Sequence, residues 1–174
     1  MRPAHRERVI LQPAGGIEAT QHYLRTVKNP IRLSSIIAVL EKDAAEALAA
    51  YYPTGWIRVW GVTPGSRGIN RTKWLQFAEG DRVLFCGQNK VFASASVRYR
   101  LHNRRLALQL WGADKSGETW EYIYFVGDPR EQGISYSRLA AAIQYSPTFV
   151  PLGVNILDHE KSAALLDAFD LTDD

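Results

Sequence analysis

Aromatic and basic side chains are crowded into the middle of this 174-residue chain. All five tryptophans lie between Trp56 and Trp120. A flat aromatic face can stack on a nucleobase, and each stacked base contributes ~1–3 kcal/mol. Residues 56–112 carry ten Lys or Arg against two acidic residues, a net charge of +8, whereas residues 113–174 carry four against eleven, a net charge of −7. This pattern is typical of a nucleic-acid binder, although a soluble sheet with arginines on its solvent face would share it.

The aromatic residues allow two interpretations. For any single tryptophan, burial in the core is the default. Two or three rings that converge at a loop-rimmed pocket would instead form an aromatic cage for a base swung out of a helix. Extruding a base costs a few kcal/mol, so basic residues that contact phosphates would be needed beside the cage. The aromatic residues at predicted strand ends or beside glycine loops are Trp56, Trp60, Trp74, Trp111, Trp120, Tyr122, Tyr124 and Phe125.

Catalytic and metal-binding motifs are absent from the sequence. The four histidines are scattered, and a single cysteine, Cys86, cannot complete a zinc site with them. There is no nucleophile elbow, phosphate-binding loop or dinucleotide fingerprint. We therefore expect no catalytic residue, no metal and no cofactor.

The elements that would position these residues can be read from hydrophobic periodicity and turn residues. The predicted strands are 8–12, 56–60, 82–86, 91–100, 104–111 and 120–126. The predicted helices are 17–26, 34–51, 135–144 and 158–169. Alternation along strand 120–126 places Trp120, Tyr122 and Tyr124 on one side of the sheet. About six strands in mostly sequential, antiparallel order, with three or four helices outside, favour an α+β domain whose curved sheet approaches a small barrel.

Chain length favours one domain, residues 1–169, followed by an acidic linker stub at residues 170–174. No apolar run is long enough for a membrane span, and no long apolar segment follows the charged N-terminus, so we expect no signal peptide. One cysteine fits a reducing compartment.

Several short segments resemble the EVE and YTH domains of the PUA-like superfamily. In particular, the chain is similar to the EVE-like modules at the N-terminus of modification-dependent restriction endonucleases, in which a His-Asn-His nuclease follows. The resemblance spans residues 8–170 and rests on scattered aromatic residues and glycines. The matching segments are Val59-Trp60-Gly61 followed by Pro64, Gly65 and Asn70, then Trp74, Gly80-Asp81-Arg82-Val83-Leu84-Phe85, Leu110-Trp111-Gly112, and Gly117-Glu118-Thr119-Trp120-Glu121-Tyr122-Ile123-Tyr124-Phe125.

The resemblance implies a PUA-like fold with a pocket for a modified base. By the YTH pattern, Trp60 is one wall of the cage, and Gly61 stands where YTH domains have Ser or Thr. The second wall falls near strand 120–126, with Trp120 as the first choice and Tyr122 or Tyr124 as alternates. Asn70 would contact the edge of the base. Contacts to the DNA backbone would come from Arg67, Arg71, Lys73, Arg98 and Arg100.

The predicted function is that of a domain that binds double-stranded DNA and flips a modified base, 5-methylcytosine or 5-hydroxymethylcytosine by preference, into the cage. It would serve as the targeting module of a modification-dependent restriction endonuclease in a prokaryotic cytoplasm. Because no nuclease motif is present, we expect this chain to bind without cutting, with a nuclease domain following it. One alternative is a reader of N6-methyladenine on DNA or RNA; an RNA reader would prefer single strands. The other is a nucleotide-processing enzyme, which would turn over an oligonucleotide.

Overall fold

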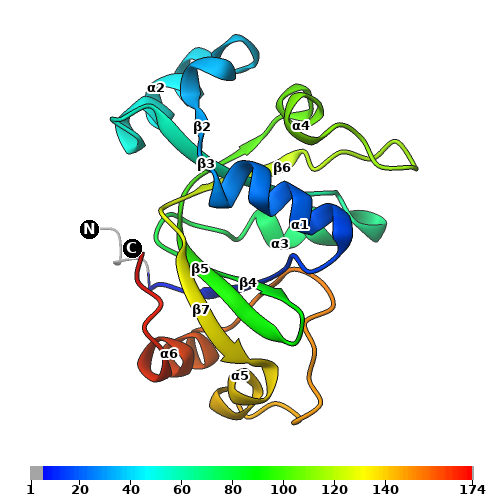
Figure 1. Ribbon diagram of the computed structural model, residues 1–174, viewed down its shortest axis with the longest axis vertical. Coiled ribbons are helices and arrows are strands. Elements are labelled where there is room, and N and C mark those ends of the chain that lie inside the picture. The colour runs from blue at the N-terminus through cyan, green and yellow to red at the C-terminus, as the bar shows by residue number, and fades with distance from the viewer. Residues whose placement is uncertain (1–5, 174) are drawn as a thin grey trace.

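The computed structural model describes residues 6–173, which form one curved sheet flanked by helices (Figure 1). The strands are β1 (Val9–Pro13), β2 (Ile31–Arg32), β3 (Trp56–Val62), β4 (Arg82–Gly87), β5 (Lys90–His102), β6 (Tyr122–Val126), β7 (Arg130–Ser135) and β8 (Asn155–Ile156). The α-helices are α1 (Ile17–Tyr23), α2 (Lys42–Tyr51), α3 (Ile69–Trp74), α4 (Arg104–Trp111), α5 (Tyr136–Ala142) and α6 (His159–Ala168). Shorter turns are the π-helical η1 (Leu24–Lys28) and the 3₁₀ turns η2 (Leu33–Ser35), η3 (Ile37–Val39) and η4 (Ser66–Gly68).

The strands run in the order β2-β3-β6-β5-β4-β1-β8, with β7 also paired to β5. All of these pairs are antiparallel except β1 with β4. The register of β5 shifts against β6 between Val97 and Tyr99, and such a bulge bends a strand. The sheet curves but does not close into a barrel. The predicted α+β class, with a mostly antiparallel curved sheet that approaches a barrel, is confirmed.

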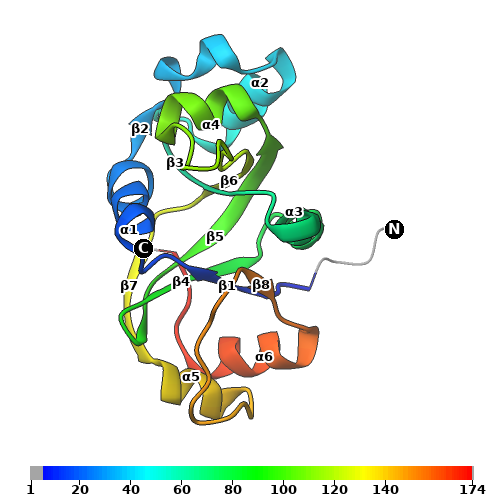
Figure 2. The same ribbon diagram turned by 90° about the vertical axis from the view of Figure 1, so that its right-hand side faces the viewer.

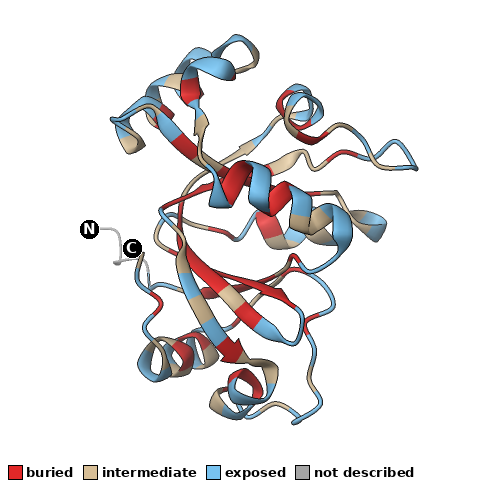
Figure 3. Ribbon diagram, in the orientation of Figure 1, coloured by how far each residue is buried: buried red, intermediate tan, exposed pale blue. Residues whose placement is uncertain are grey.

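Alternation along the strands separates the core into an inner cluster and two outer clusters. On β6, Tyr124 and Val126 face the inner cluster, which α1, η1 and α3 cover, whereas Ile123 and Phe125 face an outer cluster. One outer cluster packs under α2 and α4, and the other under α5 and α6, at opposite ends of the sheet (Figure 2). Buried residues follow the strands and one side of each helix (Figure 3). No helix in residues 6–173 is long and apolar enough to cross a membrane.

Two predicted elements are wrong. Residues 104–111 form helix α4 instead of a strand, because the Asn103 side chain caps the helix by accepting a hydrogen bond from the Leu106 amide at 2.8 Å. Leu106, Ala107 and Trp111 are buried and Leu108 is exposed, which is a helical pattern. The predicted helix 34–51 is interrupted, since Leu40 is extended and α2 begins only at Lys42.

Other differences concern the ends and number of elements. Strand β6 begins at Tyr122, two residues later than predicted, and strands β2, β7 and β8 were not predicted. The described residues contain six α-helices, more than the three or four expected. The first residues of the last two predicted helices, Ser135 and Asp158, cap helices α5 and α6, because their side chains accept hydrogen bonds from the amides of Arg138 and Lys161.

The C-terminal segment 170–173 packs onto the sheet. Leu171 is buried, and the Asp173 carboxylate accepts hydrogen bonds from the Ser96 amide at 2.7 Å and from Arg98 at 2.8 Å. Arg82 completes the contact at 3.3 Å. Residues 170–173 thus belong to the fold, and their role as a linker to a further domain stays a prediction. Residues 1–5 and Asp174, which the predicted boundaries include, lie outside the described residues.

We predict that Asp173→Asn destabilises the domain by about 1–3 kcal/mol, because it leaves Arg82 and Arg98 beside a neutral amide and removes one acceptor. The measurement is the free energy of unfolding in urea. The control is Asp167→Asn, since Asp167 is exposed and its carboxylate has no hydrogen-bond or ion-pair partner in residues 6–173. Equal losses in the two variants would contradict the prediction.

Candidate nucleic-acid interface

The segment α1–η1 lies across the inner side of the sheet (Figure 1). Its side chains project toward two different parts of the site. The segment passes from α-helical to π-helical geometry at Leu24, and π-helical turns are often found at functional sites. The buried Thr26 hydroxyl lies 2.6 Å from the Val59 carbonyl oxygen of β3, to which it donates. It accepts from Trp111 Nε1 at 3.3 Å. These two bonds fix η1 against β3 and α4.

Two of the predicted cage residues, Trp60 and Tyr124, are brought together in the inner cluster. They are directly paired across β3 and β6, and they are 3% and 0% exposed. The Trp60 ring packs edge-on against Phe85, with centroids 5.4 Å apart. The Tyr124 hydroxyl donates to Gln12 Oε1 at 2.9 Å, a bond that crosses the interior to β1. Trp60 Nε1 is buried without a hydrogen-bond partner, the one such side-chain atom in the described part of the chain.

Two other predicted cage residues, Tyr122 and Asn70, are less deeply buried. Tyr122 is half-buried, with Trp74 edge-on at 5.2 Å and His102 stacked at 4.6 Å. Asn70, on α3, is also half-buried and lies against Gly65, where a Cβ would come within 2.9 Å of its side chain. Because Gly65 also has a φ of +75°, this tight turn beside Asn70 favours glycine.

The remaining pair of cage residues, Gly61 and Trp120, contacts an outer cluster. The prediction that Trp120 shares a face with Tyr122 and Tyr124 is wrong, because Trp120 precedes the strand and alternation does not extend to it. A Cβ on Gly61 would lie 2.2 Å from the Trp120 carbonyl oxygen and 2.8 Å from the Trp111 ring. Gly61 therefore allows these two segments to approach β3. The predicted cage residues fall into two groups on opposite faces of the sheet.

His22, which the sequence did not single out, stands beside the outer group. Its ring lies edge-on to Trp120 at 4.4 Å and tilted to Trp111 at 5.7 Å. Burial of the imidazole, and then the charge of Arg25, lower the pKa of His22 to about 4. The ring is therefore neutral at physiological pH. The sequence signal was only its place on the predicted helix 17–26.

The five residues predicted to contact the DNA backbone differ in whether their charged groups already have a partner within the chain. Arg67 and Arg71 are exposed, and their guanidinium groups have no hydrogen-bond or ion-pair partner in residues 6–173. Lys73 donates to the Val154 carbonyl oxygen at 2.7 Å, and Arg98 pairs with Asp173. Arg100 donates to the Trp74 carbonyl oxygen at 2.9 Å and lies over the Trp74 ring at 5.0 Å.

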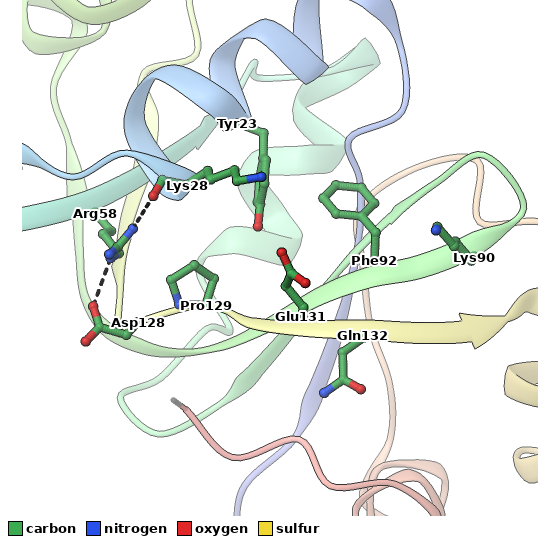
Figure 4. A pocket seen from close by; sticks show the side chains of 9 residues that line it. All are labelled: Tyr23, Lys28, Arg58, Lys90, Phe92, Asp128, Pro129, Glu131 and Gln132. Atoms are coloured by element: carbon green, nitrogen blue, oxygen red, sulfur yellow. Dashed lines mark hydrogen bonds and ion pairs between the residues drawn. The ribbon is translucent and has the colours of Figure 1, made fainter.

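An open groove that the sequence did not reveal lies between η1 and the strands β5 and β7 (Figure 4). Its main cavity measures about 670 Å³. Aromatic, basic and acidic side chains line it together. They are Tyr23, Lys28, Arg58, Lys90, Phe92, Asp128, Pro129, Glu131 and Gln132. Because the aromatic and basic members are separated by up to about seventy positions, no local motif joins them.

Comparison with solved structures identifies a protein with the same architecture. The chain matches the N-terminal domain of Thermococcus gammatolerans McrB bound to m5C DNA, with a TM-score of 0.63 and 14% sequence identity. The match covers 93% of this chain and 96% of that one. The chain has a PUA-like fold. No family model matches the sequence, and no curated protein is significantly similar to it.

Within this PUA-like fold, the described residues hold no cluster of three or more His, Cys, Asp or Glu side chains that could bind a metal ion. Cys86 is buried, and burial raises the pKa of its thiol to about 12. That pKa disfavours the thiolate form that a nucleophile requires. The aromatic rings, polar groups and exposed arginines described above can take part in stacking, hydrogen bonding and phosphate contact.

We predict that the low pKa of His22 makes the PUA-like domain less stable as the pH falls from 6.5 toward 4. In that range the unfolded chain binds a proton at this position and the folded chain does not, so the loss between pH 7.5 and pH 5 is about 1–2 kcal/mol. Unfolding in urea at the two pH values measures it. The comparison is His22→Gln, whose loss over the same interval should be smaller by that amount. Identical losses would contradict the prediction.

Proposed function

We propose that this chain is a DNA-binding module that recognises a modified base. The observation that carries the proposal is the fold likeness over 93% of the chain to a McrB domain whose structure is described as bound to m5C DNA. At 14% identity the likeness speaks for the fold, so the function has to be supported by this chain's own residues. Two features support it: the basic segment 56–112 and the aromatic clusters on both sides of β3.

We propose further that the modified base is flipped out of the duplex into an aromatic cage. Trp60 remains the proposed first wall, with Tyr124 beside it and Tyr122 at the rim. The unpaired Nε1 of Trp60 supports this, because a buried N–H without an acceptor costs ~1–3 kcal/mol. An acceptor atom on a bound base would remove that cost. Since Trp60 is nearly inaccessible, the base would enter only after the side chains at the rim move apart.

Trp120 stays in the proposal as part of a second aromatic group on the outer face, together with Trp111 and His22. Gly61 stays in the proposal as the β3 residue beside this group. Asn70 is the proposed contact to the base edge. We propose Arg67 and Arg71 as the first phosphate contacts because they are exposed and unpaired in the described residues. Lys73, Arg98 and Arg100 would have to exchange an existing intramolecular partner for a phosphate.

In this proposal the chain targets DNA and a separate nuclease domain cuts it, within a prokaryotic cytoplasm. The favoured ligands are 5-methylcytosine and 5-hydroxymethylcytosine. A preference for N6-methyladenine would keep the reader function and change its ligand. Release of cleaved or altered oligonucleotide by the purified chain would instead indicate an enzyme.

We predict at least tenfold tighter binding to one modified duplex, a difference of ~1.4 kcal/mol. Fluorescence anisotropy at fixed salt would compare duplexes of one sequence that carry cytosine, 5-methylcytosine, 5-hydroxymethylcytosine or N6-methyladenine, with a single-stranded RNA as control. Affinity should also fall steeply with salt, because phosphate contacts release counterions. Equal binding to every duplex would reject the modified-base reader.

We predict that Trp60→Phe lowers the preference for the modified duplex several-fold while changing the free energy of unfolding by less than ~1 kcal/mol. The variant keeps an aromatic ring and deletes the unpaired N–H, so removal of that cost offsets part of the lost packing. The control is Trp56→Phe, because Trp56 is exposed and stacks under Arg32. An unchanged preference in Trp60→Phe would remove Trp60 from the cage.

A further inference from the structure

We propose that the open groove between η1, β5 and β7 binds a second nucleotide of the DNA strand, with an amino-bearing base against Phe92 and its phosphate near Lys28 and Lys90. This inference rests on the proposed function, in that DNA is the source of the nucleotide. The groove is separate from the proposed interior cage: Phe85 lies between them, edge-on to Tyr23 at 5.1 Å and to Trp60 at 5.4 Å.

The groove is large enough for such a ligand. A second cavity of about 260 Å³ adjoins the one of about 670 Å³. Tyr23, Lys28, Lys90 and Phe92 line both cavities. Small-molecule sites in proteins typically measure ~300–1,000 Å³.

Phe92 offers a wall that is fixed before a ligand arrives. Its ring is half-buried and lies edge-on to Tyr23 at 4.9 Å and stacked with Phe85 at 6.4 Å. Tyr23 is itself buried in the inner cluster. Because these neighbours already hold the ring, a base that stacks on it orders little of the protein, which favours binding.

Two free cations flank this wall. The ammonium groups of Lys28 and Lys90 have no hydrogen-bond or ion-pair partner in residues 6–173. Arg58, by contrast, is fully engaged: it pairs with Asp128 at 2.9 Å and donates to the carbonyl oxygens of Val27 and of Lys28. Arg58 therefore holds the end of η1 in place, and the lysines are the groups left for a phosphate.

Glu131 determines which base the groove would accept. Its carboxylate points into the space between Tyr23 and Phe92 (Figure 4) and has no hydrogen-bond or ion-pair partner in the described chain. A carboxylate accepts hydrogen bonds from the exocyclic amino group of cytosine, and adenine carries an equivalent group. Thymine presents a carbonyl oxygen at that position, which the carboxylate would repel. The groove thus favours cytosine or adenine over thymine.

The direct test is a titration of the isotope-labelled chain with dCMP and with TMP, followed through the backbone amide signals. We expect dCMP to shift the signals of Lys28, Phe92 and Glu131 with an affinity at least threefold that of TMP. Phe92→Ala should abolish the shifts, and Glu131→Gln should remove the difference between the nucleotides. Lys28→Ala, at an exposed position, should weaken both without unfolding the chain. The matched control is Lys115→Ala, an exposed lysine outside the groove, which should change nothing.

The anisotropy assay then separates this inference from the proposed function. Lys28→Ala with Lys90→Ala should reduce the slope of log affinity against log salt by about 1 for the modified duplex, because the two lysines contact one phosphate. If the wild-type chain prefers modified DNA and neither nucleotide shifts the groove signals, the groove proposal is overturned and the reader function stands. If dCMP shifts those signals and no duplex is bound, the groove is a nucleotide site and the reader function fails.

Discussion

The Thr26 hydroxyl is the contact on which the arrangement of the candidate site depends. A hydroxyl has one proton to donate, and carbonyl oxygens of His22 and Val59 lie 3.1 and 2.6 Å away. The shorter distance assigns the proton to Val59, outside the helix. The oxygen then accepts from Trp111 Nε1. One buried side chain therefore joins the π-helical turn, strand β3 and helix α4.

That anchor sets three groups of residues at once, because all of them project from the same short segment. His22 is directed to Trp111 and Trp120, Tyr23 to Phe85 and Phe92, and Lys28 to the groove. The change from α-helical to π-helical geometry at Leu24 rotates the residues after it relative to those before it. If the α-helix continued through Lys28, the side chains of Thr26 and Lys28 would project in other directions than they do from the π-helical turn.

The sequence predicted the fold class and most strands because alternation and turn residues act locally. It failed at residues 104–111, where leucines at every second position fit a strand, and the deciding contact is the Asn103 cap. It failed for Trp120 because a shift of two residues in where β6 begins removes the alternation on which the face assignment depended. The groove was not predictable, since Lys28 and Phe92 belong to distant segments. The basic segment was visible, but the partners of Arg98 and Lys73 come from the last twenty-one residues of the chain.

The folded chain pairs some polar groups of the candidate site and leaves others without a partner. Folding pairs Arg82 and Arg98 with Asp173, and Arg58 with Asp128. These charged groups therefore stabilise the folded chain and already have partners before a ligand binds. Folding leaves the Trp60 N–H without an acceptor in the interior and the Glu131 carboxylate without a donor at the surface. A ligand gains most where it supplies a missing partner, because no existing bond has to be broken. Nucleobase edges carry both acceptors and donors, so the Trp60 N–H in the interior and the Glu131 carboxylate in the separate groove could each find the missing partner on a different base.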